Sequence, residues 1–373
     1  MCLKGGIDVD VEELKISNHK KKIRIGIMMG VFCALFWGIW YVPGYAVWNM
    51  DILTNLGINI AEQYPNMDVN TIGLMQAVFL TGINAIACAL VLFIWNGSLG
   101  KTKELKRTLV QTKAASKYFM MAGICGACAV SGTYIATNFI SAGFAAIAGL
   151  LYPIIGTTLT VLVLKQKVSR RAYAGISVIL LGGITLYLGT IAANGLSGSS
   201  VGLGLLGGIM AAVGWGCEGA VAGKALDLCE PDVGLHLRFI FEALFWCIVL
   251  AVLAIVGFPM FSTIGMLLDP ATLLVVILLG LSFGWCYVTW YKSFPFLGVP
   301  RGQAIGSLYA ACAVIFLCIF GGPAMALGYT DDTMVMIVGS TIAGLIICLI
   351  GSYLLASENT ESLVSLRDDK PSN

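Results

Sequence analysis

The chain contains ten apolar stretches, each long enough to cross a lipid bilayer as a helix. About 20 apolar residues in an α-helix span the roughly 30 Å of hydrocarbon in a membrane. Apolar residues make up 58% of the 373 residues and charged residues only 11%, a balance that soluble globular domains do not show. Ten spans leave no room for a soluble catalytic domain, so the sequence predicts an all-α integral membrane protein. The predicted spans are 24–47, 71–95, 117–138, 141–164, 171–191, 201–223, 236–257, 271–291, 302–320 and 333–355.

The 22 Lys and Arg residues predict the orientation of the chain. They fall before the first span, in every second join and after the last span, whereas the alternate joins contain only acidic charges. Cytoplasmic joins of membrane proteins are enriched in Lys and Arg. We therefore expect a plasma-membrane (cell inner membrane) protein with a cytoplasmic N-terminal segment 1–23 and a cytoplasmic tail 356–373. The joins expected inside contain Lys103, Lys167, Lys224, Arg238, Lys292 and Arg301, and those expected outside contain Glu62, Ser197, Asp269 and Asp331.

The two halves of the chain resemble each other. Trp37-Gly38 in the first span matches Trp215-Gly216 in the sixth, and Tyr152 in the fourth matches Tyr309 in the ninth. Each half has five spans, an odd number, so equivalent helices must run in opposite directions. The sequence predicts an inverted repeat, 24–191 and 201–355, around a central cavity, an architecture in which secondary transporters bind substrate near the membrane midplane.

The join between the first two spans, 49–70, is long enough to hold a structural element outside the membrane. Leu53, Leu56, Ile60 and Tyr64 follow helical spacing within it. That stripe predicts an amphipathic helix lying on a surface.

Residues 148–189, AGLLYPIIGTTLTVLVLKQKVSRRAYAGISVILLGGITLYLG, resemble the proline-bearing fourth helix, basic turn and glycine-rich fifth helix of the drug/metabolite transporter (DMT) superfamily. The likeness to its ten-helix, EamA-like members implies a metabolite transporter with both termini inside and a central cavity lined by both halves. Two features depart from the family pattern. Lys165-Gln166 and Gly321-Gly322-Pro323 stand where many members carry Glu, and the outer join is unusually long.

Two acidic residues lie within predicted spans, where an ionisable group needs a functional or structural reason. Glu218 has small neighbours in the sixth span and occupies the place matched to Trp40. We expect it to face the cavity; the alternative is a carboxylate near the interface that pairs with Lys224. Glu242 lies four residues after Arg238, so a structural ion pair is expected there, with a gating or proton-relay role as the alternative.

Aromatic residues in the spans provide the second signal. Tyr and Trp at span ends form interfacial belts, which accounts for Tyr45, Trp48, Trp290 and Tyr291. Buried Tyr and Trp at midplane need hydrogen-bond partners and favour a polar cavity. For the polar Asn84, a tie between helices and a ligand contact are equally supported. The predicted substrate-binding residues are Trp37, Trp40, Tyr41, Asn84, Tyr134, Tyr152, Trp215, Glu218, Trp285 and Tyr309.

Several function classes are disfavoured. The chain has no phosphate-binding loop, only two His residues and no Cys in a predicted outer join, so we expect no catalytic residues, cofactor, metal, disulfide framework or nucleic-acid partner. The favoured function is secondary transport across the lipid bilayer by alternating access. Aromatic faces around a carboxylate favour an amine or quaternary ammonium substrate such as choline. One alternative is a transporter of a neutral amino acid or sugar coupled to protons. Another, of a different class, is a membrane enzyme or scaffold without transport. The coupling ion and the oligomeric state are left open.

Overall fold

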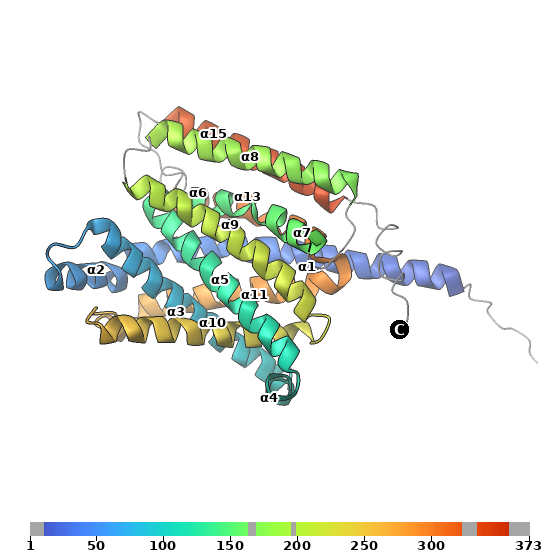
Figure 1. The fold of residues 1–373 in the computed structure, drawn as a ribbon, viewed down its shortest axis with the longest axis horizontal. Helices are drawn as coiled ribbons and strands as arrows, with labels where there is room; N and C mark the ends of the chain where they lie inside the picture. Colours follow the sequence, from blue (N-terminus) through green and yellow to red (C-terminus); the bar gives the residue numbers. More distant parts are fainter. Residues whose placement is uncertain (1–10, 163–168, 195–198, 323–333, 358–373) are drawn as a thin grey trace, which may run out of the picture.

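The computed structural model describes residues 11–162, 169–194, 199–322 and 334–357. The secondary structure of these residues is helical, and ten helical stretches are long and apolar enough to cross a membrane (Figure 1). The predicted all-α fold with ten spans is therefore confirmed. The first half contains α1 (Val11–Ala46), η1 (Val47–Asn49), α2 (Asp51–Gln63), α3 (Val69–Ser98), α4 (Thr102–Gln111), α5 (Lys113–Phe139), α6 (Ala142–Gly149), α7 (Tyr152–Leu162) and α8 (Arg170–Asn194). The second half contains α9 (Ser199–Ala225), α10 (Pro231–Ile255), η2 (Ile264–Leu268), α11 (Pro270–Leu297), α12 (Val299–Gly306), α13 (Tyr309–Gly321) and α15 (Met334–Ala356).

The fourth and ninth spans are each interrupted near their middle. The fourth predicted span, 141–164, consists of α6 and α7, and the ninth, 302–320, falls on α12 and α13. In the fourth span Pro153 explains the break, because proline lacks an amide hydrogen and fits best in the first turn of a helix. The ninth span breaks at the equivalent place without a proline. Both breaks put a tyrosine, Tyr152 or Tyr309, at the start of the following helix.

The helices of the two halves pack in a reciprocal pattern. The third span, α5, packs along the sixth, α9, and the first, α1, packs along the eighth, α11. Exchanging the halves converts one of these pairs into the other. The second and seventh spans, α3 and α10, pack together, as do the fifth and tenth, α8 and α15. This pattern is consistent with the inverted repeat that the sequence predicts.

Helices α8 and α15 lie side by side along one edge of the bundle (Figure 1). A methyl group added at Gly175 would lie 2.7 Å from the carbonyl oxygen of Gly351, and one added at Gly182 would lie 2.8 Å from that of Gly344. The glycines that the sequence repeats at a spacing of seven therefore face each other and allow the two backbones to approach closely.

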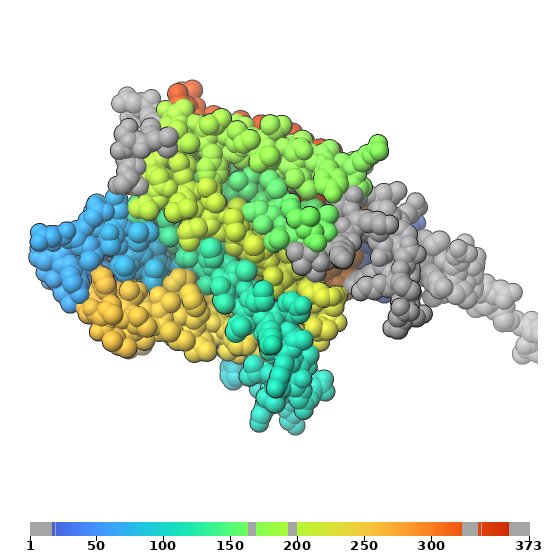
Figure 2. All heavy atoms as spheres, in the orientation of Figure 1, coloured from blue at the N-terminus to red at the C-terminus, as the bar shows by residue number. Residues whose placement is uncertain are grey.

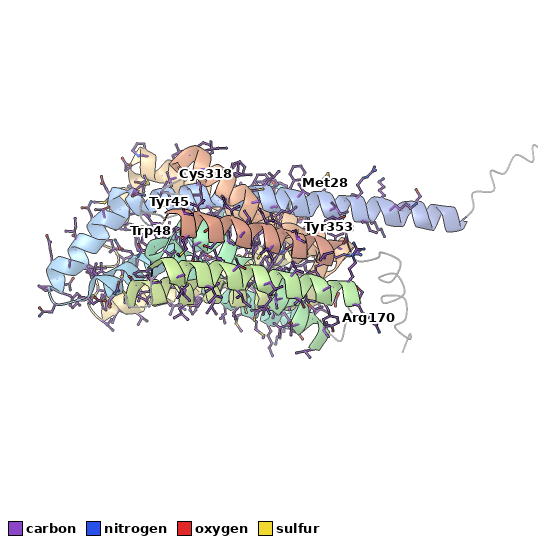
Figure 3. All side chains as sticks on the ribbon, turned by 90° about the horizontal axis from the view of Figure 1, so that it is seen from above. Met28, Tyr45, Trp48, Arg170, Cys318 and Tyr353 are labelled. Carbon is purple, nitrogen blue, oxygen red and sulfur yellow. The ribbon has the colours of Figure 1, made fainter. Side chains whose placement is uncertain are left out.

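Segment 49–70, which the sequence predicts to lie outside, contains a helix, α2, as predicted. Leu53, Leu56 and Ile60 on the expected stripe are fully buried. This stripe therefore packs against the protein. Asn59 ties α2 to the α10–α11 connection beside it (Figure 2), because its Nδ2 donates to Ser262 Oγ at 2.9 Å. Figure 3 places Tyr45 and Trp48 near this end of the bundle, whereas Arg170 and Tyr353 lie at the other end.

Two cations assigned to cytoplasmic joins lie inside helices instead. Arg238 is in the second turn of α10 and Arg301 in the first turn of α12, at 0% and 4% exposure. Arg238 already falls near the start of the predicted span 236–257, and α10 begins before that span. Helix α12 begins before the predicted span 302–320 and therefore includes Arg301. Lys165, Gln166, Lys167, Ser197, Pro323, Asp331, residues 1–10 and residues 358–373 lie outside the described residues.

Candidate functional site

Three charged side chains form a fully buried cluster in the membrane region. Arg238 on α10 lies between Glu218 on α9 and Glu242 on α10, and all three are 0% exposed. The Nε of Arg238 donates to Glu218 Oε1 at 2.7 Å and its Nη2 to Glu218 Oε2 at 3.1 Å. The Nη1 of Arg238 donates to Glu242 Oε2. Such bidentate, charge-assisted pairs are strong and directional.

Two tyrosines on α11 complete the surroundings of Glu218. Tyr287 donates its hydroxyl to Glu218 Oε2 at 2.9 Å, and Tyr291 donates to Oε1 at 3.0 Å. These tyrosines are one helical turn apart and so share a face. The Tyr287 hydroxyl also accepts from Trp215 Nε1 at 3.2 Å and from Arg238 Nη2 at 3.1 Å. It therefore connects the charged cluster to the aromatic residues.

The local sequence explains why the guanidinium lies where it does. Arg238 and Glu242 are four residues apart on one helix, the spacing at which side chains meet. The guanidinium carbon lies 4.0 Å from the ring centre of Phe239 and 4.5 Å from that of Tyr287. On the facing helix α5, a methyl group at Gly126 would overlap Arg238 Nη2. A residue without a side chain at this position leaves the space that the guanidinium fills.

Trp37 is the centre of an aromatic cluster beside these charges. Its ring stacks on Tyr309 with centroids 4.2 Å apart and meets Trp215 edge-on at 4.7 Å. Trp290 and Tyr152 lie at 5.6 and 5.7 Å. All five rings are 0% exposed, so the cluster is packed rather than open to solvent.

The two tyrosines that the sequence relates by the repeat make reciprocal hydrogen bonds. Tyr152 donates to the carbonyl oxygen of Gln303 at 2.5 Å, and Tyr309 donates to that of Ala146 at 2.8 Å. Each accepting carbonyl lies in the other half, three residues before the end of the helix that precedes the break. Each tyrosine thus ties its own broken span to the other.

Asn84 holds a second group of aromatic residues beside the Trp37 cluster. Its Oδ1 accepts from Trp40 Nε1 at 2.9 Å and from the Tyr134 hydroxyl at 3.3 Å, which joins α1, α3 and α5. Tyr41 lies 5.1 Å from Trp40 and stacks at 6.0 Å on Tyr309. The group is therefore continuous with the Trp37 cluster.

The structure brings together nine of the ten residues predicted for the site. Trp285 is the exception: it is partly exposed and packs against Trp95 at 4.6 Å and Phe36 at 6.3 Å, on another side of α11. The sequence assigned Trp290 and Tyr291 to the interfacial belt, and this is wrong for both, since both are 0% exposed. Tyr287, Trp290 and Tyr291 were detectable by their spacing of three and four, which places them on one helical face.

Among the residues of these clusters, six polar atoms are buried without a hydrogen-bond partner. They are Nε1 of Trp37 and Trp290, Nδ2 of Asn84, the Tyr41 hydroxyl, and Oε1 of Glu242 and Gln303. Buried polar groups normally have partners, so unpaired ones indicate a site where a ligand or water binds. Within the described ranges, His, Cys, Asp and Glu form no group of three that could hold a metal ion.

Comparison with known proteins agrees with this architecture. Residues 70–188 match the model of the EamA-like transporter family. One solved crystal structure that is 15% identical aligns over 90% of this chain and 99% of its own, with a TM-score of 0.52, and shows that the fold is shared. No curated protein sequence matches the chain. The match over residues 70–188 and the ten apolar helices together confirm the resemblance to the DMT superfamily, as a ten-helix, EamA-like membrane protein.

Proposed function

We propose that the protein is a secondary transporter of a small organic cation, an amine or quaternary ammonium compound of the choline type. The family match supports a membrane transporter of small solutes. The observation that carries the cationic substrate is the charge count in the buried cluster: two carboxylates, Glu218 and Glu242, share one guanidinium, Arg238. With both carboxylates ionised, one negative charge is uncompensated, and a bound cation would neutralise it.

The aromatic cluster supports the same substrate class. Several ring faces lie next to the charged cluster, on Trp37, Trp215, Trp290, Tyr152 and Tyr309. The two clusters are joined by Trp215, whose Nε1 donates to the Tyr287 hydroxyl. A desolvated cation over a Trp or Tyr face gains up to about 2 kcal/mol, and quaternary ammonium groups are bound in this way by aromatic cages. Unlike the isolated countercharge expected from the sequence, Glu218 acts here as part of a network.

The packing supports alternating access. We propose the inverted repeat 24–191 and 201–355, because α5–α9 and α1–α11 are exchanged when the halves are exchanged. The two broken spans meet at Tyr152 and Tyr309, each held by one hydrogen bond to the other half. Rocking of one half against the other would open the packed aromatic cluster to either side, in the plasma membrane and with both termini cytoplasmic as the sequence predicts.

A second candidate is a proton-coupled transporter of a neutral amino acid or sugar. The unpartnered Oε1 of Glu242 favours it, because a proton bound there would neutralise the excess charge without any organic cation. The two candidates differ in what drives uptake.

Flux into proteoliposomes tests both candidates. Labelled choline and tetramethylammonium are compared with labelled amino acids and sugars, with and without a pH gradient. We expect cation uptake in the wild type and its loss in Glu218→Gln, while Asp227→Asn, at an exposed ion pair with Lys224, transports normally. Normal cation flux in Glu218→Gln contradicts the proposal, and uptake of only neutral solutes on a pH gradient establishes the second candidate.

Trp37→Leu separates a ring-face contact from space filling. If the ring contacts a quaternary amine, its loss weakens binding by roughly 1–2 kcal/mol, or about 5- to 30-fold. The same loss for an uncharged analogue of equal shape would show that Trp37 only fills space.

A further inference from the structure

The surroundings of the Arg238 guanidinium have the composition of an organic-cation site. Two carboxylates, from Glu218 and Glu242, face it, and the rings of Phe239 and Tyr287 lie 4.0 and 4.5 Å from its central carbon. Every one of these side chains is fully buried. Acidic groups combined with aromatic faces are what proteins use to bind amines and quaternary ammonium ions. The protein's own guanidinium thus occupies a site suited to a cationic ligand.

The two carboxylates hold Arg238 in different ways. Glu242 is on the same helix, four residues away, so the Arg238–Glu242 pair moves with α10 as a unit. Glu218 is on α9, so its two hydrogen bonds with Arg238 join separate helices. A relative movement of α9 and α10 can therefore break the contact between Arg238 and Glu218 but not the one between Arg238 and Glu242.

Glu218 keeps partners when Arg238 leaves it. Tyr287 and Tyr291 on α11 each donate a hydroxyl to one of its oxygens, at 2.9 and 3.0 Å. Those hydroxyls hold the carboxylate in place between α9 and α11, beside the ring of Trp215 that bonds Tyr287. A second cation could then take the position of the guanidinium on Glu218 without a rearrangement of α11.

We propose that Arg238 is an internal cation that occupies Glu218 in the absence of substrate and yields it to the substrate cation while staying paired with Glu242. This inference rests on the proposed function as an organic-cation transporter. It makes Arg238 a determinant of specificity. A neutral solute cannot displace the guanidinium, because it would leave Glu218 ionised and buried without a counter-charge.

A charge-balanced variant tests the inference. Arg238→Met combined with Glu242→Gln removes one positive and one negative charge, so the net charge of the buried cluster is unchanged and Glu218 keeps both tyrosines. Binding of tetramethylammonium and of guanidinium to the purified protein is measured by titration calorimetry. Arg107→Met combined with Glu104→Gln is the matched control, since it removes one exposed ion pair outside the site.

We expect the charge-balanced variant to bind tetramethylammonium about tenfold more tightly than the wild type. The reason is that Arg238 no longer competes for Glu218 through its charge-assisted hydrogen bonds. Adding Glu218→Gln should abolish that gain, and the control should match the wild type. In Arg238→Lys, which keeps the charge and loses the two-point contact, affinity should rise by a smaller factor. This single variant tests the inference even if the double variant does not fold.

Two results would overturn the inference. If neither the double variant nor Arg238→Lys binds the cation more tightly than the wild type, Arg238 does not compete for Glu218. Wild-type flux that depends on Glu218 would then leave the proposed function standing. If the double variant binds the cation but the wild type neither binds nor transports it, Arg238 is a permanent structural partner, and the proposed function fails as well.

Discussion

Replacing Gly126 by alanine would test whether the position of Arg238 depends on the space that α5 leaves open. The added methyl group would overlap Nη2 of Arg238 and lie 2.9 Å from Oε2 of Glu218. Helix α5 packs against both α9 and α10, so the far end of the Arg238 side chain is easier to displace than the helix. The guanidinium must therefore withdraw from its position.

The magnitude follows from the bonds that this withdrawal breaks. Nη2 donates to Glu218 Oε2 and to the Tyr287 hydroxyl, both at 3.1 Å. Hydrogen bonds that involve a charged group contribute about 1.5–3 kcal/mol each, so losing both costs about 3–6 kcal/mol. Alanine favours a helix over glycine by about 1 kcal/mol. The free energy of unfolding should therefore fall by about 2–5 kcal/mol, a change in the direction opposite to helix propensity.

Denaturant titration of the purified protein in detergent micelles measures this difference. Gly202→Ala in α9 is the control, because a methyl group there meets no atom within 4 Å. It should raise stability by up to about 1 kcal/mol. If Gly126→Ala is as stable as Gly202→Ala, the guanidinium is not confined by α5, and the argument from close packing is refuted.

Two further predictions concern the orientation of the chain and the Asp232 network at the end of the bundle that the sequence predicts to be cytoplasmic. A cysteine replacing Glu62 should react with an impermeant thiol reagent on intact cells, and one replacing Lys103 should not, in a background without reactive native thiols; the reverse pattern would invert the topology. Asp232→Asn should lower the free energy of unfolding by about 1–3 kcal/mol. Asp232 accepts from Lys101 at 2.6 Å, Lys292 at 2.9 Å and Trp95 at 3.1 Å. The loss is limited because both lysines can still reach water in the variant. Asp227→Asn, at an exposed pair, should change stability by no more than about 0.5 kcal/mol, and an equal loss in both variants would show that the buried network adds nothing.

Much of the candidate site was predictable from local signals. Glu218 stands out because an acidic residue within an apolar span is rare. Tyr152 and Tyr309 stand out because they occupy equivalent places in the two halves, and the structure gives them equivalent hydrogen bonds. The stripe of Leu53, Leu56 and Ile60 predicted α2 correctly, since a helix at a water-facing surface shows its buried side as a periodic pattern.

By itself, the sequence determined the ten spans, because length and hydropathy decide whether a helix can cross a membrane. Only the tertiary structure decided which faces of those helices form the site. Lipid is as apolar as a protein interior, so a span that is apolar all round does not reveal which side faces protein. For this reason the sequence placed Tyr291 at the interface and Arg238 in a join, whereas the packing of α9, α10 and α11 buries both against Glu218.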